Sequence, residues 1–120
     1  MDEFIRRFFE AYSQLYLLHW QTKKYGRHIA FDEVNEELED LVDRFVEAYM
    51  GKKGERVKLV GDIVVKNIDE LNLGQFINGY ISFLVNDIPQ LASDKDVDLL
   101  AIRDEMVALL HKLKYLLTLD

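Results

Sequence analysis

Two histidines and several carboxylates occur at spacings that suit a metal site. His28 precedes Asp32, and Asp43 precedes Glu47, each by one helical turn, so each pair lies on one side of a helix. At about 100° per residue, one helix face carries an imidazole and a row of carboxylates, from His28, Asp32, Glu36, Glu39, Asp43 and Glu47. The apolar stripe of the same helix falls on the opposite side. Imidazole and carboxylate ligands without thiolates suit iron, manganese or zinc.

An acidic helix face is more commonly a solvated surface, because charges usually lie opposite an apolar stripe. Such a surface normally mixes charge signs at the spacing of one turn. Here like charges repeat, in Asp32 with Glu36 and in Asp43 with Glu47. They repel each other unless a cation or a neighbouring chain lies between them. The pattern therefore favours a metal site, with Glu36 or Glu39 as an auxiliary ligand.

His19 supplies a second imidazole, near the end of the preceding predicted helix. A single histidine in such a place is more often a buried structural residue. The turn after it is short, so the two helices lie antiparallel and His19 and His28 approach each other across the turn. His111, between lysines on the last helix, is predicted to be a surface residue. The predicted metal ligands, which are also the predicted catalytic residues, are His19, His28, Asp32, Asp43 and Glu47.

Apolar residues at intervals of three or four predict four helices. The expected spans are residues 2–24, 29–50, 73–87, and 93 or 94 to 117. Tyr25-Gly26 is expected to end the first helix and Gly51 the second, because glycine tolerates the left-handed cap conformation. Pro89 is expected to stop or kink the third helix at Ile88.

The segment from Gly51 to Asn72 has two interpretations. Residues 57–60 and 63–66 flank Gly61-Asp62 and form a tight hairpin in the first. In the second, the segment is a crossover with one short helix. A long connection between the second and third helices predicts an all-α, ferritin-like four-helix bundle, since an up-down-up-down bundle needs only short loops. The length of 120 residues fits a single domain, residues 1–120.

The amino-acid composition excludes several classes of protein. The chain has no cysteine, which excludes disulfides, zinc fingers, iron–sulfur clusters and thiol catalysis. A net charge of −7 suits cation uptake, and the short basic clusters at 23–27 and 52–58 are interpreted as loop ends, so no DNA binding is expected. No apolar run could cross a bilayer, and the acidic start is no signal peptide. A cytoplasmic protein without a membrane partner is expected.

The sequence resembles the Dps family of mini-ferritins, as a short divergent member. His19-Trp20 is followed by Gly26, His28 and Asp32, and then by Asp43-x-x-x-Glu47, at the spacing of that family from His28 onward. The turn between the two histidines is shorter than in familiar members. The last helix is similar as well, although the usual Trp is replaced by Leu. The absence of a Glu-x-x-His motif argues against the larger ferritins.

The resemblance implies an iron site at a two-fold interface. One chain gives the two histidines and the first acidic residue, and the other gives Asp43 and Glu47. It also implies Fe(II) oxidation, typically by peroxide, storage of the mineral in a cage of twelve chains, and uptake of stray oxidising equivalents by Trp20. This chain lacks the basic N-terminal arm on which DNA binding in the family relies, so that activity is not carried over.

Three functions remain in competition. The first is a ferroxidase that sequesters iron, with zinc or manganese as alternative metals. The second is a ferritin-like structural or assembly protein without catalytic activity, and the third is a metal-free helical domain that binds a partner. The intact ligand spacing favours the first. It requires at least a two-fold dimer, because a helix face that points away from its own core needs a second chain to enclose a metal ion.

Overall fold

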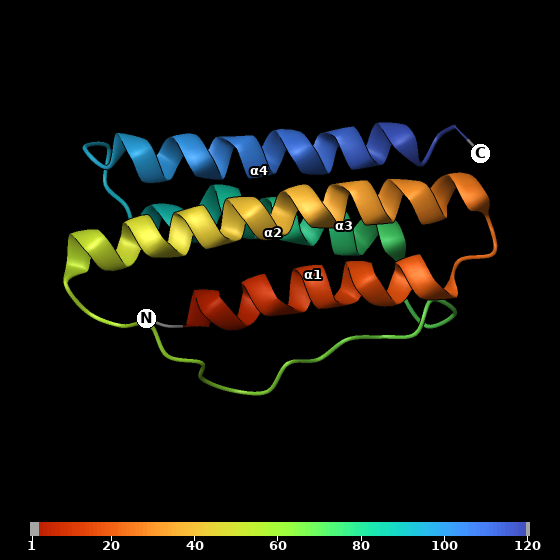
Figure 1. Cartoon of the computed structure of the whole chain (residues 1–120), viewed down its shortest axis with the longest axis horizontal. Helices are drawn as coiled ribbons and strands as arrows, with labels where there is room; N and C mark the ends of the chain where they lie inside the picture. Colours follow the sequence, from red (N-terminus) through yellow and green to blue (C-terminus); the bar gives the residue numbers. More distant parts are fainter. Residues whose placement is uncertain (1–2, 120) are drawn as a thin grey trace.

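The computed structural model describes residues 3–119, and every regular element in that range is helical. The long helices are α1 (Glu3–Gln21), α2 (Tyr25–Lys53), α3 (Leu73–Ser82) and α4 (Val97–Leu116). A π-helical turn (Phe83–Asp87) and a 3-10 turn (Ile88–Gln90) extend α3. The helices pack side by side in a bundle of 44 × 27 × 21 Å (Figure 1). The predicted all-α class is confirmed.

The helices run in two directions along the bundle. In Figure 1, α1 and α4 run one way, and α2 and α3 run the other way. Residues 22–24 make a tight link between α1 and α2, whereas residues 54–72 return along α1 from the end of α2 to the start of α3. Helix α2 lies against both α1 and α4. None of the helices between residues 3 and 119 is long and apolar enough to cross a membrane.

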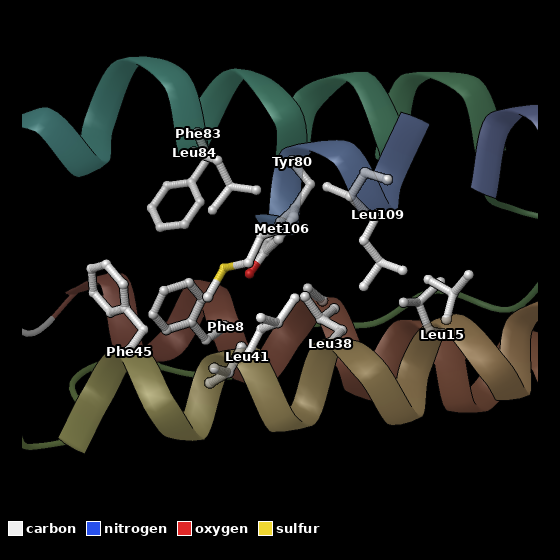
Figure 2. Close-up of a cluster of buried hydrophobic side chains, with 14 of the residues drawn as sticks. Phe8, Leu15, Leu38, Leu41, Phe45, Tyr80, Phe83, Leu84, Met106 and Leu109 are labelled. Carbon is white, nitrogen blue, oxygen red and sulfur yellow. The ribbon is translucent and has the colours of Figure 1, made fainter. Parts of the chain in front are cut away.

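All four helices contribute to one apolar core. Figure 2 shows side chains from α1, α2, the α3 extension and α4 that point toward one another, among them Phe8, Phe45, Leu84 and Met106. The rings of Phe8 and Phe45 meet edge to face with centroids 5.6 Å apart, a favourable aromatic geometry. The stripe predicted for the second helix is buried, at Val34, Leu38, Leu41, Phe45 and Tyr49. The acidic side of α2 therefore points away from the core, as predicted.

The predicted boundary between the first two helices was wrong. Helix α1 ends at Gln21 rather than Lys24, and Tyr25 and Gly26 lie in the first turn of α2. A left-handed cap needs a positive φ, and within residues 3–119 only Gly54 and Gly61 have one. Gly26 therefore lies in the first turn of α2 and does not cap α1.

The second helix also continues past its predicted end. Gly51 lies inside α2, and Gly54 ends it with a φ of 72° and an N–H that donates to the carbonyl of Met50 at 2.9 Å. At the other end of the chain, α4 begins at Val97 and not at 93 or 94. The Asp96 carboxylate accepts the N–H of Ser93 at 2.8 Å, which forms a turn before the helix. The third α-helix ends at Ser82, earlier than predicted, and continues as a π turn and a 3-10 turn, so Ile88 keeps a right-handed helical conformation before Pro89.

The connection 54–72 forms neither the expected hairpin nor a short helix. The buried side chain of Gln14 accepts the N–H of Lys66 and donates to its carbonyl, both at 2.8 Å. Gln21 accepts the N–H of Ile68 at 2.8 Å. The backbone thus pairs with side chains of α1 rather than with a second strand. Gly61, with a φ of 85°, makes a bend where a hairpin turn was predicted.

Candidate metal centre

The first two predicted ligands meet where α1 leads into α2. The rings of His19 and His28 stack with centroids 3.9 Å apart and planes 18° from parallel. Nδ1 of each ring lies 2.8 Å from the backbone carbonyl oxygen of the other residue. The ring of Tyr25 is also stacked with that of His28, with centroids 6.4 Å apart. The short link between the helices creates this contact, because it brings the end of α1 against the start of α2.

The two hydrogen bonds determine which ring nitrogens remain available. A carbonyl oxygen only accepts, so Nδ1 is the donor in both histidines. The neutral rings then carry their lone pairs on Nε2. An Nδ1–H bound to a backbone carbonyl is the usual support of a metal-ligating histidine, because it fixes the tautomer and the ring orientation. In both histidines Nε2 is therefore the ring nitrogen that is not used in this contact.

Asp32 is the third predicted ligand that lies here. Its Oδ1 is 4.0 Å from Nε2 of His19. The His19 side chain is 14% exposed, whereas that of Asp32 is 56% exposed, so the carboxylate stands at the edge of the protein. Among the described residues, no three His, Asp or Glu side chains are arranged to hold a metal ion by themselves.

Asp43 and Glu47 lie further along the same helix, roughly 16 Å or more from Asp32 along its axis. Both are exposed. The pKa of Glu47 is raised, because its carboxyl shares a hydrogen bond with Asp43 and is repelled by the charge of that residue. This is the like-charge contact that the sequence predicts. The pair does not reach the histidines of its own chain.

The acidic face of α2 is divided between two grooves. Glu36, with Glu33 and Glu37, lines a wide groove between α2 and α4. Glu39 and Asp43 line a mostly apolar hollow of about 360 Å³ between α1 and α2. Glu36 thus lies on the side of α2 toward α4, and Glu39 lies on the side toward α1.

Aromatic residues on α1 continue from this second hollow, which Tyr12 lines. Tyr16 stacks on the exposed Trp20, with centroids 5.9 Å apart. The charge of Glu39 raises the pKa of Tyr16, and burial together with Glu39 raises that of Tyr12 to about 12. The sequence analysis named Trp20 but missed Tyr12 and Tyr16. Their spacing of one helical turn, beside the apolar stripe of α1, is the signal that identifies them.

The remaining histidine lies apart from this centre. His111 is exposed on α4, as predicted. Of the predicted ligands, the structure brings together His19, His28 and Asp32, and it places Asp43 and Glu47 at a second position on the same helix. The predicted ligands therefore form two separate groups along α2.

Residues 19–117 match a family of unknown function, DUF5856, and the chain belongs to this family. The matched range begins at His19 and includes every predicted ligand. The chain is also similar to an uncharacterized 14.6 kDa protein from the mobD-ri intergenic region of Enterobacteria phage T4. The two are 26% identical over 120 residues, which cover 99% of this chain and 88% of the phage protein. No solved structure matches the chain.

Proposed function

We propose that the chain is a ferritin-like, Dps-type protein that binds Fe(II) as its substrate, oxidises it and sequesters the product. The observation that carries this proposal is the reciprocal contact of His19 and His28, which leaves Nε2 available in both rings. Metal binding explains why two imidazoles are oriented in this way beside the Asp32 carboxylate. Zinc and manganese suit the same donors and are the alternative metals.

The arrangement of the helices supports a ferritin-like bundle. The second and third helices run in the same direction, and such bundles join them by a long crossover. We interpret residues 54–72 as that crossover. The acidic, cysteine-free sequence is consistent with a cytoplasmic protein.

A second copy of the chain would complete the site. Asp43 and Glu47 cannot converge with the histidines of their own chain, because about three helical turns separate them from Asp32. An antiparallel copy of α2 across a two-fold axis places them against His28 and Asp32 of the first chain, and it makes two equivalent sites. The raised pKa of Glu47 supports this role, since a bound cation would relieve the repulsion that causes it. A cage of twelve chains is the larger assembly that we propose on the resemblance alone.

The chemistry follows from the donors. Carboxylates stabilise Fe(III) more than Fe(II), so binding to Asp32, Asp43 and Glu47 favours oxidation. Two Fe(II) ions each give one electron to a peroxide, which takes up two protons and leaves as two water molecules. The histidines hold and orient the ion through Nε2 during this step. Residues of α1 and α2 would thus hold the ion, and peroxide would take up the electrons.

A ferritin-like assembly protein without catalytic activity is the second candidate. One observation favours it: the described part of a single chain holds no complete set of ligands. In that case the histidine contact joins α1 to α2 and has only a structural role. The two candidates differ in whether Asp43 and Glu47 are needed for the oxidation of Fe(II).

The test compares two pairs of substitutions on the same helix. Asp43→Asn with Glu47→Gln removes proposed ligands, and Glu33→Gln with Glu37→Gln removes equal charge from the groove toward α4. We expect the first pair to abolish Fe(II) oxidation by peroxide, followed by ferric absorbance, and to keep the metal-free dimer. The second pair should oxidise iron at the wild-type rate. Fe(II) should also tighten the wild-type dimer and raise its melting temperature by mass action.

Two outcomes would reject the proposal. One is rapid oxidation by a protein that sedimentation shows to be strictly monomeric. The other is an equal loss of activity in both pairs of variants, which would assign the effect to the overall negative charge of α2.

A further inference from the structure

The connection between α2 and α3 has one backbone edge held by α1. The N–H groups of Lys66 and Ile68 donate to Gln14 and Gln21 at 2.8 Å, and that of Val64 donates to Glu10 at 3.5 Å. The carbonyl of Lys66 also faces Gln14. Backbone groups that point to one side at every second residue are typical of an extended strand. Residues 64–68 therefore have the alternating backbone directions of a strand, and their inner edge is paired with side chains of a helix instead of with a sheet.

The outer edge of this strand is unpaired. In an extended strand the intervening residues, Ile63 and Val65, direct their N–H and carbonyl groups away from α1. Neither residue makes a hydrogen bond with any other part of the chain that the structure describes. The side chains of Ile63, Val64 and Val65 are apolar and exposed, Val64 to 62%. An exposed apolar strand edge is a template for pairing with another strand.

We propose that this edge pairs antiparallel with the same edge of a second copy, about a two-fold axis at Val64. In this register Ile63 of one copy lies opposite Val65 of the other. Each of the two residues donates its backbone N–H to the carbonyl of the other, and the two-fold symmetry forms the same pair of hydrogen bonds a second time. Val64 faces its own symmetry mate as a non-hydrogen-bonded pair, in which side chains approach closely. The backbone N–H and carbonyl groups of Ile63 and Val65 in each copy then all have hydrogen-bond partners.

Charge complementarity selects this register. A two-fold axis at Val64 places Asp62 opposite Lys66 of the second copy, and opposite charges across strands stabilise the pairing. An axis at Asp62 would instead set Asp62 against itself and Lys58 against Lys66. An axis at Ile63 or Val65 would leave the charges unpaired. Asp62 and Lys66 make no side-chain hydrogen bond or ion pair within residues 3–119, so both are available.

This interface is separate from the proposed metal interface. Gln14 holds the connection, whereas Tyr12 lines the groove together with Glu39, and Glu39 also acts on Tyr16. Both tyrosines lie about 200° from Gln14 around α1. The two surfaces are thus on opposite sides of that helix. The inference therefore goes beyond the proposed function and does not depend on metal binding. A protein that used both two-fold contacts would form assemblies larger than a dimer.

The test uses the full chain without metal, in the presence of a chelator. Sedimentation equilibrium over a concentration series measures self-association of wild type, of Asp62→Lys, and of Asp62→Lys with Lys66→Asp. The single variant sets like charges opposite each other at two symmetric positions, and we expect its association constant to fall at least about tenfold. The double variant exchanges the charges and should restore the wild-type value. Because both side chains are exposed in a connection, neither change should disturb the helices.

A backbone variant tests the strand pairing itself. Val65→Pro removes an outward N–H and favours extended geometry at Val64, so the inner edge is kept. We expect it to abolish the association that Asp62→Lys weakens. The amides of Ile63 and Val65 in wild type should gain protection from hydrogen exchange as the protein concentration rises. Self-association that neither variant changes, or a wild type without concentration-dependent protection at these amides, would reject the proposal.

Discussion

His19 and His28 orient each other, because the Nδ1 of each ring donates to the backbone carbonyl of the other at 2.8 Å. Loss of one ring removes one proposed ligand and also takes away the stacking partner of the other ring. We expect His19→Ala to lower the affinity for Zn(II) or Co(II), measured by calorimetry, at least about tenfold. His111→Ala, on the exposed side of α4, is the control and should bind as wild type does. Equal affinity of all three proteins would mean that the histidine contact is only structural.

The contact of Asp43 with Glu47 should make stability depend on pH. The folded pKa of Glu47 is raised by its hydrogen bond to Asp43 and by the charge of that residue, so the ionised form of Glu47 is disfavoured in the folded state and costs stability at pH values above that pKa. This penalty disappears as the pH falls through the raised pKa, because Glu47 then gains a proton. We expect metal-free Asp43→Asn to be more stable than wild type at pH 7, with a difference that shrinks toward pH 4.5 in urea unfolding. Asp94→Asn is the control, and it should match wild type at both values.

Alanine substitutions at two glycines near the end of α2 should change the stability of the protein in opposite directions. Gly51 is helical, and a Cβ there would meet no atom within 4 Å, so Gly51→Ala should stabilise the protein by about 1 kcal/mol. Gly54 has a φ of 72°, so Gly54→Ala should destabilise it by about 1 kcal/mol. Chemical denaturation of both variants measures the difference. Stabilisation by both changes would show that the helix ends elsewhere.

Gln14 is the buried anchor of the connection 54–72. Gln14→Leu leaves the N–H and carbonyl of Lys66 without their partners, and we expect a loss of about 1–2 kcal/mol in the free energy of unfolding. Hydrogen exchange at residues 64–68 should become faster at the same time. Gln21→Leu, which removes a less buried contact, should cost less. A larger loss for Gln21→Leu would move the main anchor to the other end of the connection.

Tyr80 carries a hydroxyl that is buried without a hydrogen-bond partner in the described part of the chain. Burial raises the pKa of this phenol well above its usual range, so it stays neutral. Tyr80→Phe removes an unsatisfied polar atom and should stabilise the protein by about 1 kcal/mol. Tyr115→Phe, at an exposed position, should have no effect. Destabilisation by Tyr80→Phe would indicate a bound water as the partner of the hydroxyl.

Hydrophobic spacing predicts the helices and their inward faces because burial follows the helical period. It therefore predicts that Val34, Leu38 and Phe45 face inward, and that the acidic side of α2 faces outward. The approach of His19 to His28 is also predictable from the sequence, because the link between their helices is so short that the helices must lie antiparallel. Helix ends are harder to predict, because a glycine such as Gly51 is tolerated inside an exposed helix at a small cost. Only the backbone conformation shows that Gly54 is the cap.

Two features of the molecule depend on contacts that cannot be predicted from the local sequence pattern. The path of residues 54–72 depends on Gln14, a polar residue whose burial is explained only by the backbone of Lys66. The mutual orientation of the histidines depends on backbone carbonyls, which every residue has. The completion of the centre by Asp43 and Glu47 depends on a second chain, and it stays a prediction.

Every residue of the buried core lies before residue 50 or after residue 76. The connection along α1 therefore carries the chain from one helical pair to the other without filling the interior. In genetic terms, the coding sequence has a natural break at this point. Two polypeptides, one with α1 and α2 and the other with α3 and α4, keep between them all the surfaces that form the core. Cutting the chain near Gly61 would turn one protein into a complementing pair of fragments whose reassembly depends on their concentration.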